Sequence, residues 1–176
     1  MLFSGLPFLY YFLPAVLVCY FAAPRKLKNA VLFVFSLIFY GWGEPRYIVL
    51  MIVSIVSGFV FALMIEKKQN KKSGLILMWI SVAVSLSFLL IFKYADFLIE
   101  NVNQLPGVSL PLSKLSLPIG ISFYTFQIIS YTVDVWRGDT KAQRNIISFG
   151  TYVSLFPQLI AGPIVRYTDI ERELQE

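Results

Sequence analysis

Long apolar stretches that carry almost no charge constrain this chain more than any other feature. Several of them approach or exceed the roughly 18 residues needed to cross about 30 Å of hydrocarbon. Only 14% of the 176 residues are charged, whereas soluble domains carry about 25%. A surface with so little charge would not stay dispersed in water. We therefore predict an all-α, polytopic membrane protein that has membrane lipid as its solvent and no separate soluble domain.

The apolar stretches predict about five transmembrane helices within a single region, 1–176. Their expected positions are near 3–23, 30–42, 47–65, 74–92 and 115–136. The second helix is short, because at 1.5 Å per residue it covers only about 20 Å. Residues 94–105 are expected to form a separate amphipathic helix at the outer surface of the membrane.

Basic residues gather in the short loops that follow the first and third apolar stretches. These residues are Arg25, Lys26, Lys28, Lys67, Lys68, Lys71 and Lys72. The positive-inside rule places both loops in the cytoplasm and the N-terminus outside. The basic loops lack the aromatic residues on which single-stranded nucleic acid stacks. The net charge of +5 therefore does not indicate a nucleic-acid partner.

The fifth apolar stretch carries polar residues at helical spacing. Steps of four, three, four and three residues place the following on one stripe of a helix: Gly120, Tyr124, Gln127, Tyr131 and Asp134. An aspartate at the bilayer centre costs about 3 kcal/mol, so the stripe must face protein or a water-filled cavity. Two interpretations remain open. The stripe either holds helices together, with an Asp134–Arg137 pair near the interface, or it forms the wall of a substrate channel.

A second unusual segment, 146–165, reads as a helix that the sequence interrupts. Pro157 removes a backbone donor and bends the path, and Gly162–Pro163 interrupts it again. The freed backbone groups cannot face lipid, so they are expected inside protein or beside a water-filled cavity. The segment either re-enters, which returns Arg166 to the cytoplasm, or crosses the membrane as a proline-kinked helix. We favour re-entry.

Two stretches, "LPIGISFYTFQIISYTVDVWRG" and "FPQLIAGPIVRY", resemble motifs of the membrane-bound O-acyltransferase (MBOAT) family, both in their residues and in the distance between them. The resemblance is strongest to its alginate O-acetyltransferase-like branch, and it extends to "LFSGLPFLYYFLP" and "FYGWGEPRYIVLM". It implies a partial MBOAT fold in the bacterial cytoplasmic (inner) membrane. It also implies an acyl donor such as acetyl-CoA or an acyl carrier, a polysaccharide acceptor that is exported or at the cell surface, and a partner membrane or periplasmic acyltransferase protein.

The resemblance supplies two sets of motif positions. Candidate cavity-lining residues are Tyr124, Gln127, Tyr131, Asp134, Arg137, Gln158 and Arg166. Residues expected to interrupt the helices are Pro118, Gly120, Pro157, Gly162 and Pro163.

The chain departs from the family in one important respect. Family members use a membrane-embedded histidine on a later helix, and full members are much longer, whereas this chain has no histidine. Acyl transfer to a hydroxyl needs a positioned base or an activated nucleophile, and Asp134 is the only acid in the stripe.

We therefore expect no catalytic residue and no metal site in this chain. It is expected to be the N-terminal fragment of such an enzyme, inactive alone. The alternative is a non-catalytic membrane scaffold or export component that retains half of the fold. A small transporter is a third, less favoured option.

Overall fold

The computed structural model describes residues 5–69, 71–104, 111, 117–161 and 165–175, and these residues form helices joined by short turns and loops. The elements are η1 (a π-helix, Phe8–Phe12), α1 (Leu13–Ala22), η2 (a 3₁₀ helix, Arg25–Leu27), α2 (Lys28–Gly43), α3 (Ile48–Lys67), α4 (Lys72–Val102), α5 (Ile121–Arg137), α6 (Ile146–Ser154), α7 (Phe156–Ala161) and α8 (Tyr167–Gln175). No strand occurs within these ranges, and the predicted all-α class is confirmed.

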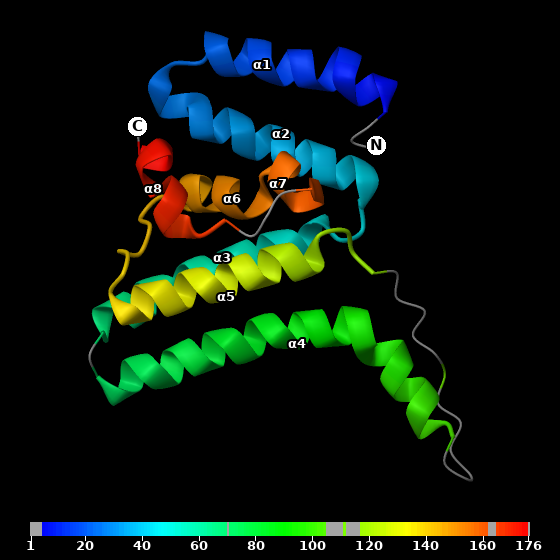
Figure 1. Cartoon of the computed structure of the whole chain (residues 1–176), viewed down its shortest axis with the longest axis vertical. Helices are drawn as coiled ribbons and strands as arrows, with labels where there is room; N and C mark the ends of the chain where they lie inside the picture. Colours follow the sequence, from blue (N-terminus) through cyan, green and yellow to red (C-terminus); the bar gives the residue numbers. More distant parts are fainter. Residues whose placement is uncertain (1–4, 70, 105–110, 112–116, 162–164, 176) are drawn as a thin grey trace.

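The longer helices run back and forth beside one another (Figure 1). α5 packs against α3 and α4, while α6 packs against α2 and α3. α1 packs on η1 and α2, at the edge of the assembly. The main core is therefore shared by α3, α5 and α6. A smaller, phenylalanine-rich cluster lies between η1, α1, α2 and α7.

Two helices, Ile48–Lys67 and Lys72–Val102, are long and apolar enough to cross a membrane, and Phe8–Ala22 and Ile146–Leu159 are shorter apolar helices. Large apolar side chains also lie on the outer surface, among them Trp79 and Phe97. An apolar outer surface suits contact with lipid tails. These features indicate a membrane protein, while the count of about five crossing helices stays a prediction.

The predicted division of the fourth apolar stretch is wrong. Residues 74–92 and 94–105 were expected to form two helices, but α4 continues without a break from Lys72 to Val102. No proline or glycine occurs between Leu75 and Val102, so nothing in the sequence ends the helix there. α4 instead bends in its C-terminal part, and its end projects away from the other helices (Figure 1).

The break in the segment 146–165 lies slightly earlier than expected. α6 ends at Ser154, and Leu155 leaves the helical region with a ψ of 112°. α7 then begins at Phe156, with Pro157 in its first turn. The proline has no N–H to continue α6, and its ring would clash with the carbonyl of Val153. At the start of a new helix neither problem arises. Gly162 and Pro163 lie outside the described residues.

Candidate functional site

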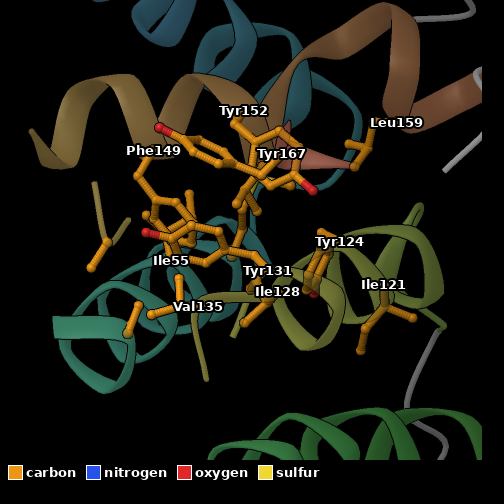
Figure 2. Packing of buried hydrophobic residues seen from close by; sticks show 14 of the residues in the cluster. Ile55, Ile121, Tyr124, Ile128, Tyr131, Val135, Phe149, Tyr152, Leu159 and Tyr167 are labelled. Carbon is orange, nitrogen blue, oxygen red and sulfur yellow. The ribbon is translucent and has the colours of Figure 1, made fainter. Parts of the chain in front are cut away.

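The polar stripe of α5 faces the interior of the protein. The exposed fraction is 0% for Tyr124 and Tyr131, 2% for Gln127 and 4% for Asp134. Figure 2 shows the two tyrosines on the same side of α5 as the buried Ile128. A polar stripe buried by neighbouring helices avoids the cost of polar groups in lipid.

Tyr131 lies in an aromatic cluster with Phe149, Tyr152 and Tyr167. Its ring centroid is 4.8 Å from that of Phe149, 4.8 Å from that of Tyr167 and 6.5 Å from that of Tyr152. These distances suit aromatic pairs, and Figure 2 shows the rings gathered between the helices. The cluster therefore joins α5, which carries the first motif, to α6 and to the start of α8, where the second motif ends with Tyr167.

Hydrogen bonds reinforce the aromatic cluster. The Gln143 backbone N–H donates to the Tyr131 hydroxyl at 2.7 Å, and the Gln143 side-chain amide donates to the Tyr167 hydroxyl at 2.8 Å. The Tyr152 hydroxyl donates to the Val165 carbonyl at 3.1 Å. Burial raises the pKa of Tyr167 to about 12, so its hydroxyl stays protonated at neutral pH. Gln143 thus ties the loop before α6 to the first residue of α8.

Asp134, near the C-terminal end of α5, is a buried acid whose carboxylate is incompletely hydrogen-bonded among the described residues. Its Oδ2 atom is buried and has no hydrogen-bond partner within the part of the chain that the structure describes. Arg166 and Arg137 are the cations that act most strongly on its carboxylate. Both arginines are exposed, and neither forms an ion pair with Asp134 in the described ranges. The Asp134–Arg137 pair that one of the two interpretations offered is therefore not seen as an ion pair among the described residues, and Arg137 is exposed at the end of the buried stripe.

The backbone turns sharply after Asp134. Gly138 has a φ of +86°, and the N–H groups of Gly138 and Asp139 both donate to the Asp134 carbonyl at 3.0 Å. A left-handed glycine of this kind is a common helix C-terminus. Gln69 adds a hydrogen bond from its side-chain amide to the Val135 carbonyl at 3.2 Å. The turn between α3 and α4 thus supports the end of the helix that carries Asp134.

At the other end of α5, the first motif contacts α7. Gly120 has a φ of +74° and a ψ of 2°, a left-handed conformation that glycine adopts most easily. A Cβ atom added there would lie 2.6 Å from Cγ of Leu159. The neighbouring Pro118 is buried, while Pro157 is exposed. The close approach of Leu159 to Gly120 brings together the two motifs that the sequence singled out.

Three buried polar side-chain atoms lie on α2, α5 and α7. The buried hydroxyls of Tyr124 and of Tyr40, from α2, are close enough to influence each other. Neither hydroxyl has a hydrogen-bond partner of good geometry among the described residues, and the same is true of Nε2 of Gln158. Buried polar atoms normally find partners, so each exception needs an explanation. These atoms suit a place where water or a polar ligand supplies the missing hydrogen bonds.

An open pocket of about 590 Å³ lies between the end of α3, the loop before α6 and the start of α8. Its charged lining residues are Glu66, Asp139, Lys141, Arg144 and Glu171. Glu66 accepts a hydrogen bond from the Ala142 N–H at 3.1 Å and forms an ion pair with Arg144. The pocket is polar, with charges of both signs, and it lies beside the aromatic cluster through Tyr167.

Sequence reasoning missed four aromatic residues of this site: Tyr40, Phe149, Tyr152 and Tyr167. Tyr40 could have been suspected, because its hydroxyl falls inside the short apolar stretch 30–42 and would also need a partner there. Tyr152 lies within the predicted segment 146–165 and Tyr167 is the last residue of the second motif, but neither position indicates which residues it contacts. Their importance comes from contacts between helices that are distant in sequence. The site as a whole combines a buried polar stripe with a charged pocket at one end, but the chain has no histidine to act as a base.

Comparison with known proteins gives a consistent result. The chain is 38% identical to the probable alginate O-acetylase AlgI of Pseudomonas syringae pv. tomato, over 97% of this chain and 34% of that protein. It is 38% identical to the protein of the same name from Pseudomonas aeruginosa, with the same coverage. It is 28% identical to the peptidoglycan O-acetyltransferase of Helicobacter pylori, over 100% of this chain and 39% of that protein.

The chain thus spans about a third of the length of the curated relatives it matches. No family model matches it, and no solved structure does. The similarity to alginate O-acetylases nevertheless covers nearly the whole chain, including both motifs. The chain is therefore homologous to a segment of the alginate O-acetylases, which confirms its resemblance to the alginate O-acetyltransferase-like branch of the MBOAT family.

Proposed function

We propose that the chain is the N-terminal part of a membrane-bound O-acetyltransferase. The complete enzyme would transfer acetyl groups to an exported or cell-surface polysaccharide. The observation that carries this proposal is the 38% identity to alginate O-acetylases over 97% of the chain. The relative from Helicobacter pylori is named for peptidoglycan, so the shared feature of the acceptors is a polysaccharide. A non-catalytic scaffold or export component is the second candidate, because the sequence has no histidine.

The proposed location is the bacterial inner membrane, with the N-terminus outside and about five crossing helices. The segment 146–165 is proposed to re-enter. Two hydrogen bonds support this: Gln143 donates to Tyr167 at 2.8 Å, and Thr140 donates to Glu171 at 2.9 Å. Both join the loop before α6 to α8. The chain therefore returns, after the break, to the end of the bundle from which α6 starts (Figure 1).

The charge distribution supports the same topology. The side chain of Asn29, next to the first basic loop, donates to the Ser148 hydroxyl at 3.1 Å near the start of α6. The ion pair of Glu66 with Arg144 joins the end of α3 to the loop before α6. The basic loops thus share one end of the bundle with the proposed return of the re-entrant segment. By the positive-inside rule that end faces the cytoplasm.

We assign the open pocket of about 590 Å³ to the approach of the acyl donor, which would be acetyl-CoA or an acyl carrier. A path is proposed to lead from this pocket to the outer side of the membrane. The residues proposed to line or border it are Tyr124, Gln127, Tyr131, Asp134, Arg137, Gln158 and Arg166. The remaining part of the enzyme would supply the catalytic histidine. A partner membrane or periplasmic acyltransferase protein would complete delivery to the polysaccharide.

A chimera tests the proposed function. We expect that this chain, substituted for the matching segment of the Pseudomonas aeruginosa relative, supports O-acetylation of alginate in cells that lack their own acetylase. The measurement is the O-acetyl content of secreted alginate, with immunoblotting of membranes to establish that the chimera is inserted. A chimera present at the normal level that leaves alginate unacetylated would contradict the proposal and favour the scaffold.

In the same chimera, Asp134→Asn and Arg166→Ala are each expected to lower the O-acetyl content on the order of tenfold. The reason is that the buried carboxylate and the nearby cation position groups beside the path, and small displacements of reacting groups are costly. Glu100→Gln is the control, since Glu100 is an exposed acid near the end of α4 and does not line the pocket assigned to the acyl donor. Full activity in both test variants would refute the assignment of these residues.

A further inference from the structure

A second open pocket, of about 470 Å³, lies where the start of α4 meets the end of α5. Its lining consists of Lys71, Lys72, Leu75, Trp136 and Arg137. Three of these five residues are cations and none is an acid. They come from two segments that are distant in sequence, so the packing of α4 against α5 creates the cluster. This pocket shares no lining residue with the pocket assigned to the acyl donor.

None of the three cations of this pocket forms an ion pair within the part of the chain that the structure describes. The ion pair of Glu66 with Arg144 involves none of the three cations. Asp134 is close enough to act on Arg137 but is buried, and Asp139 lines the other pocket. Lys72 is also the first residue of a 31-residue helix, whose N-terminal N–H groups add a positive field. The three cations and the helix start would therefore attract an anion to this pocket.

The rest of the pocket is apolar and continues into the outer surface. Leu75 is exposed, and Trp136 is partly buried against the main core. Next to Leu75 on α4, Ile76 and Trp79 expose large apolar side chains. Tryptophan is typical of the boundary between lipid tails and headgroups. A ligand that fits this surface has an anionic head for the cations and an apolar tail for α4.

We propose that Lys71, Lys72 and Arg137, with Trp136 and Leu75, bind the headgroup of an anionic glycerophospholipid. Basic pockets between membrane helices on the cytoplasmic side suit such headgroups. The phosphate lies between the three cations, and an acyl chain follows the exposed face of α4. The site would hold α4 and α5 together at the membrane surface. It does not depend on acyl transfer by the complete enzyme.

Lipid quenching of a single tryptophan tests this site. In the whole chain, Trp42→Phe and Trp79→Phe leave Trp136 as the only tryptophan, and both replaced residues are exposed. The protein is reconstituted in phosphatidylcholine bilayers that contain brominated phosphatidylglycerol or brominated phosphatidylcholine. We expect brominated phosphatidylglycerol to quench the fluorescence of Trp136 more strongly than brominated phosphatidylcholine does. The ratio of the two quenching efficiencies is the lipid preference at Trp136. Each substitution among Lys71→Gln, Lys72→Gln and Arg137→Gln should lower that preference about fivefold, until it is lost in the triple variant.

Two control variants separate this site from general surface charge. Arg25→Gln, Lys26→Gln and Lys28→Gln together remove three cations from the other basic loop and should leave the preference at Trp136 intact. A second triple variant keeps the positive charges, with Lys71→Arg, Lys72→Arg and Arg137→Lys. It should keep both the fold and the lipid preference at Trp136.

Three results would overturn the proposal. The first is a preference that survives the triple glutamine variant. The second is an equal loss in the variant of the other basic loop. The third is displacement of the brominated lipid by millimolar glycerol 3-phosphate, which would assign the site to a soluble phosphate.

Discussion

Replacing Tyr131 by alanine is expected to lower the free energy of unfolding by about 3–5 kcal/mol, the range found when a large buried aromatic side chain is removed. Tyr131 has an exposed fraction of 0%, and its ring lies against those of Phe149 and Tyr167 at 4.8 Å each. Its removal opens a cavity between three helices and also leaves the Gln143 N–H without its acceptor. The measurement is denaturant unfolding of the purified chain in mild detergent, followed by circular dichroism.

Two substitutions separate packing from other effects of the Tyr131 change. Tyr131→Phe keeps the ring and removes only the hydroxyl that accepts from Gln143, so it should cost about 1 kcal/mol. Tyr11→Ala removes the same side chain from a position that is 77% exposed, where little packing is lost within the chain. If Tyr131→Ala destabilised the protein no more than Tyr11→Ala does, the aromatic cluster would not hold α5, α6 and α8 together.

The cluster also shows what could and could not be predicted from the sequence. The spacing of Tyr124, Gln127, Tyr131 and Asp134 predicts a helix with one polar side, and the cost of polar groups in lipid predicts that this side is buried. Both expectations depend only on local periodicity and on the solvent. The structure has α5 in this place, with all four residues buried.

What the stripe contacts depends on long-range packing, which local patterns do not encode. Tyr40 lies far from Tyr124 in sequence, and their proximity arises from how α2 and α5 are arranged around α6 and α7. Likewise Tyr167 follows the broken segment and reaches Tyr131 only because the chain turns back. Arg137 was grouped with Asp134 by its i, i+3 spacing, yet the left-handed turn at Gly138 ends the helix and leaves Arg137 at the surface.

In the described part of the chain, proline and glycine interrupt helices where they were expected to, but the helix boundaries themselves were predicted less well: α5 begins at Ile121, after Pro118 and Gly120, and not at 115. Pro157 interrupts its segment as expected, although the break falls at Leu155 because the proline is accommodated in the first turn of α7. No such residue occurs in the last part of α4, and the change from apolar to amphipathic sequence near Lys93 does not end the helix. A change in polarity alters what a helix faces, and the hydrogen bonds of its backbone continue.

Replacing Gly120 by alanine is expected to cost about 2–5 kcal/mol, which combines two effects. A non-glycine residue in the left-handed region costs about 1–2 kcal/mol, and overpacking a buried contact costs about 1–3 kcal/mol. Gly120 has a φ of +74°, and the new Cβ would lie 2.6 Å from Cγ of Leu159. The same unfolding measurement in detergent checks the value.

Gly43→Ala is the matched control for Gly120→Ala, because a Cβ at Gly43 meets no atom within 4 Å, and its cost should be close to zero. The double variant Gly120→Ala, Leu159→Ala removes the clash while it keeps the backbone strain. It should therefore cost less than the sum of the two single variants. If the two losses of unfolding free energy were strictly additive, Leu159 of α7 would not contact the start of α5 closely. In that case the two motifs would not be in contact in the folded protein, and the path proposed between them would lose its outer end.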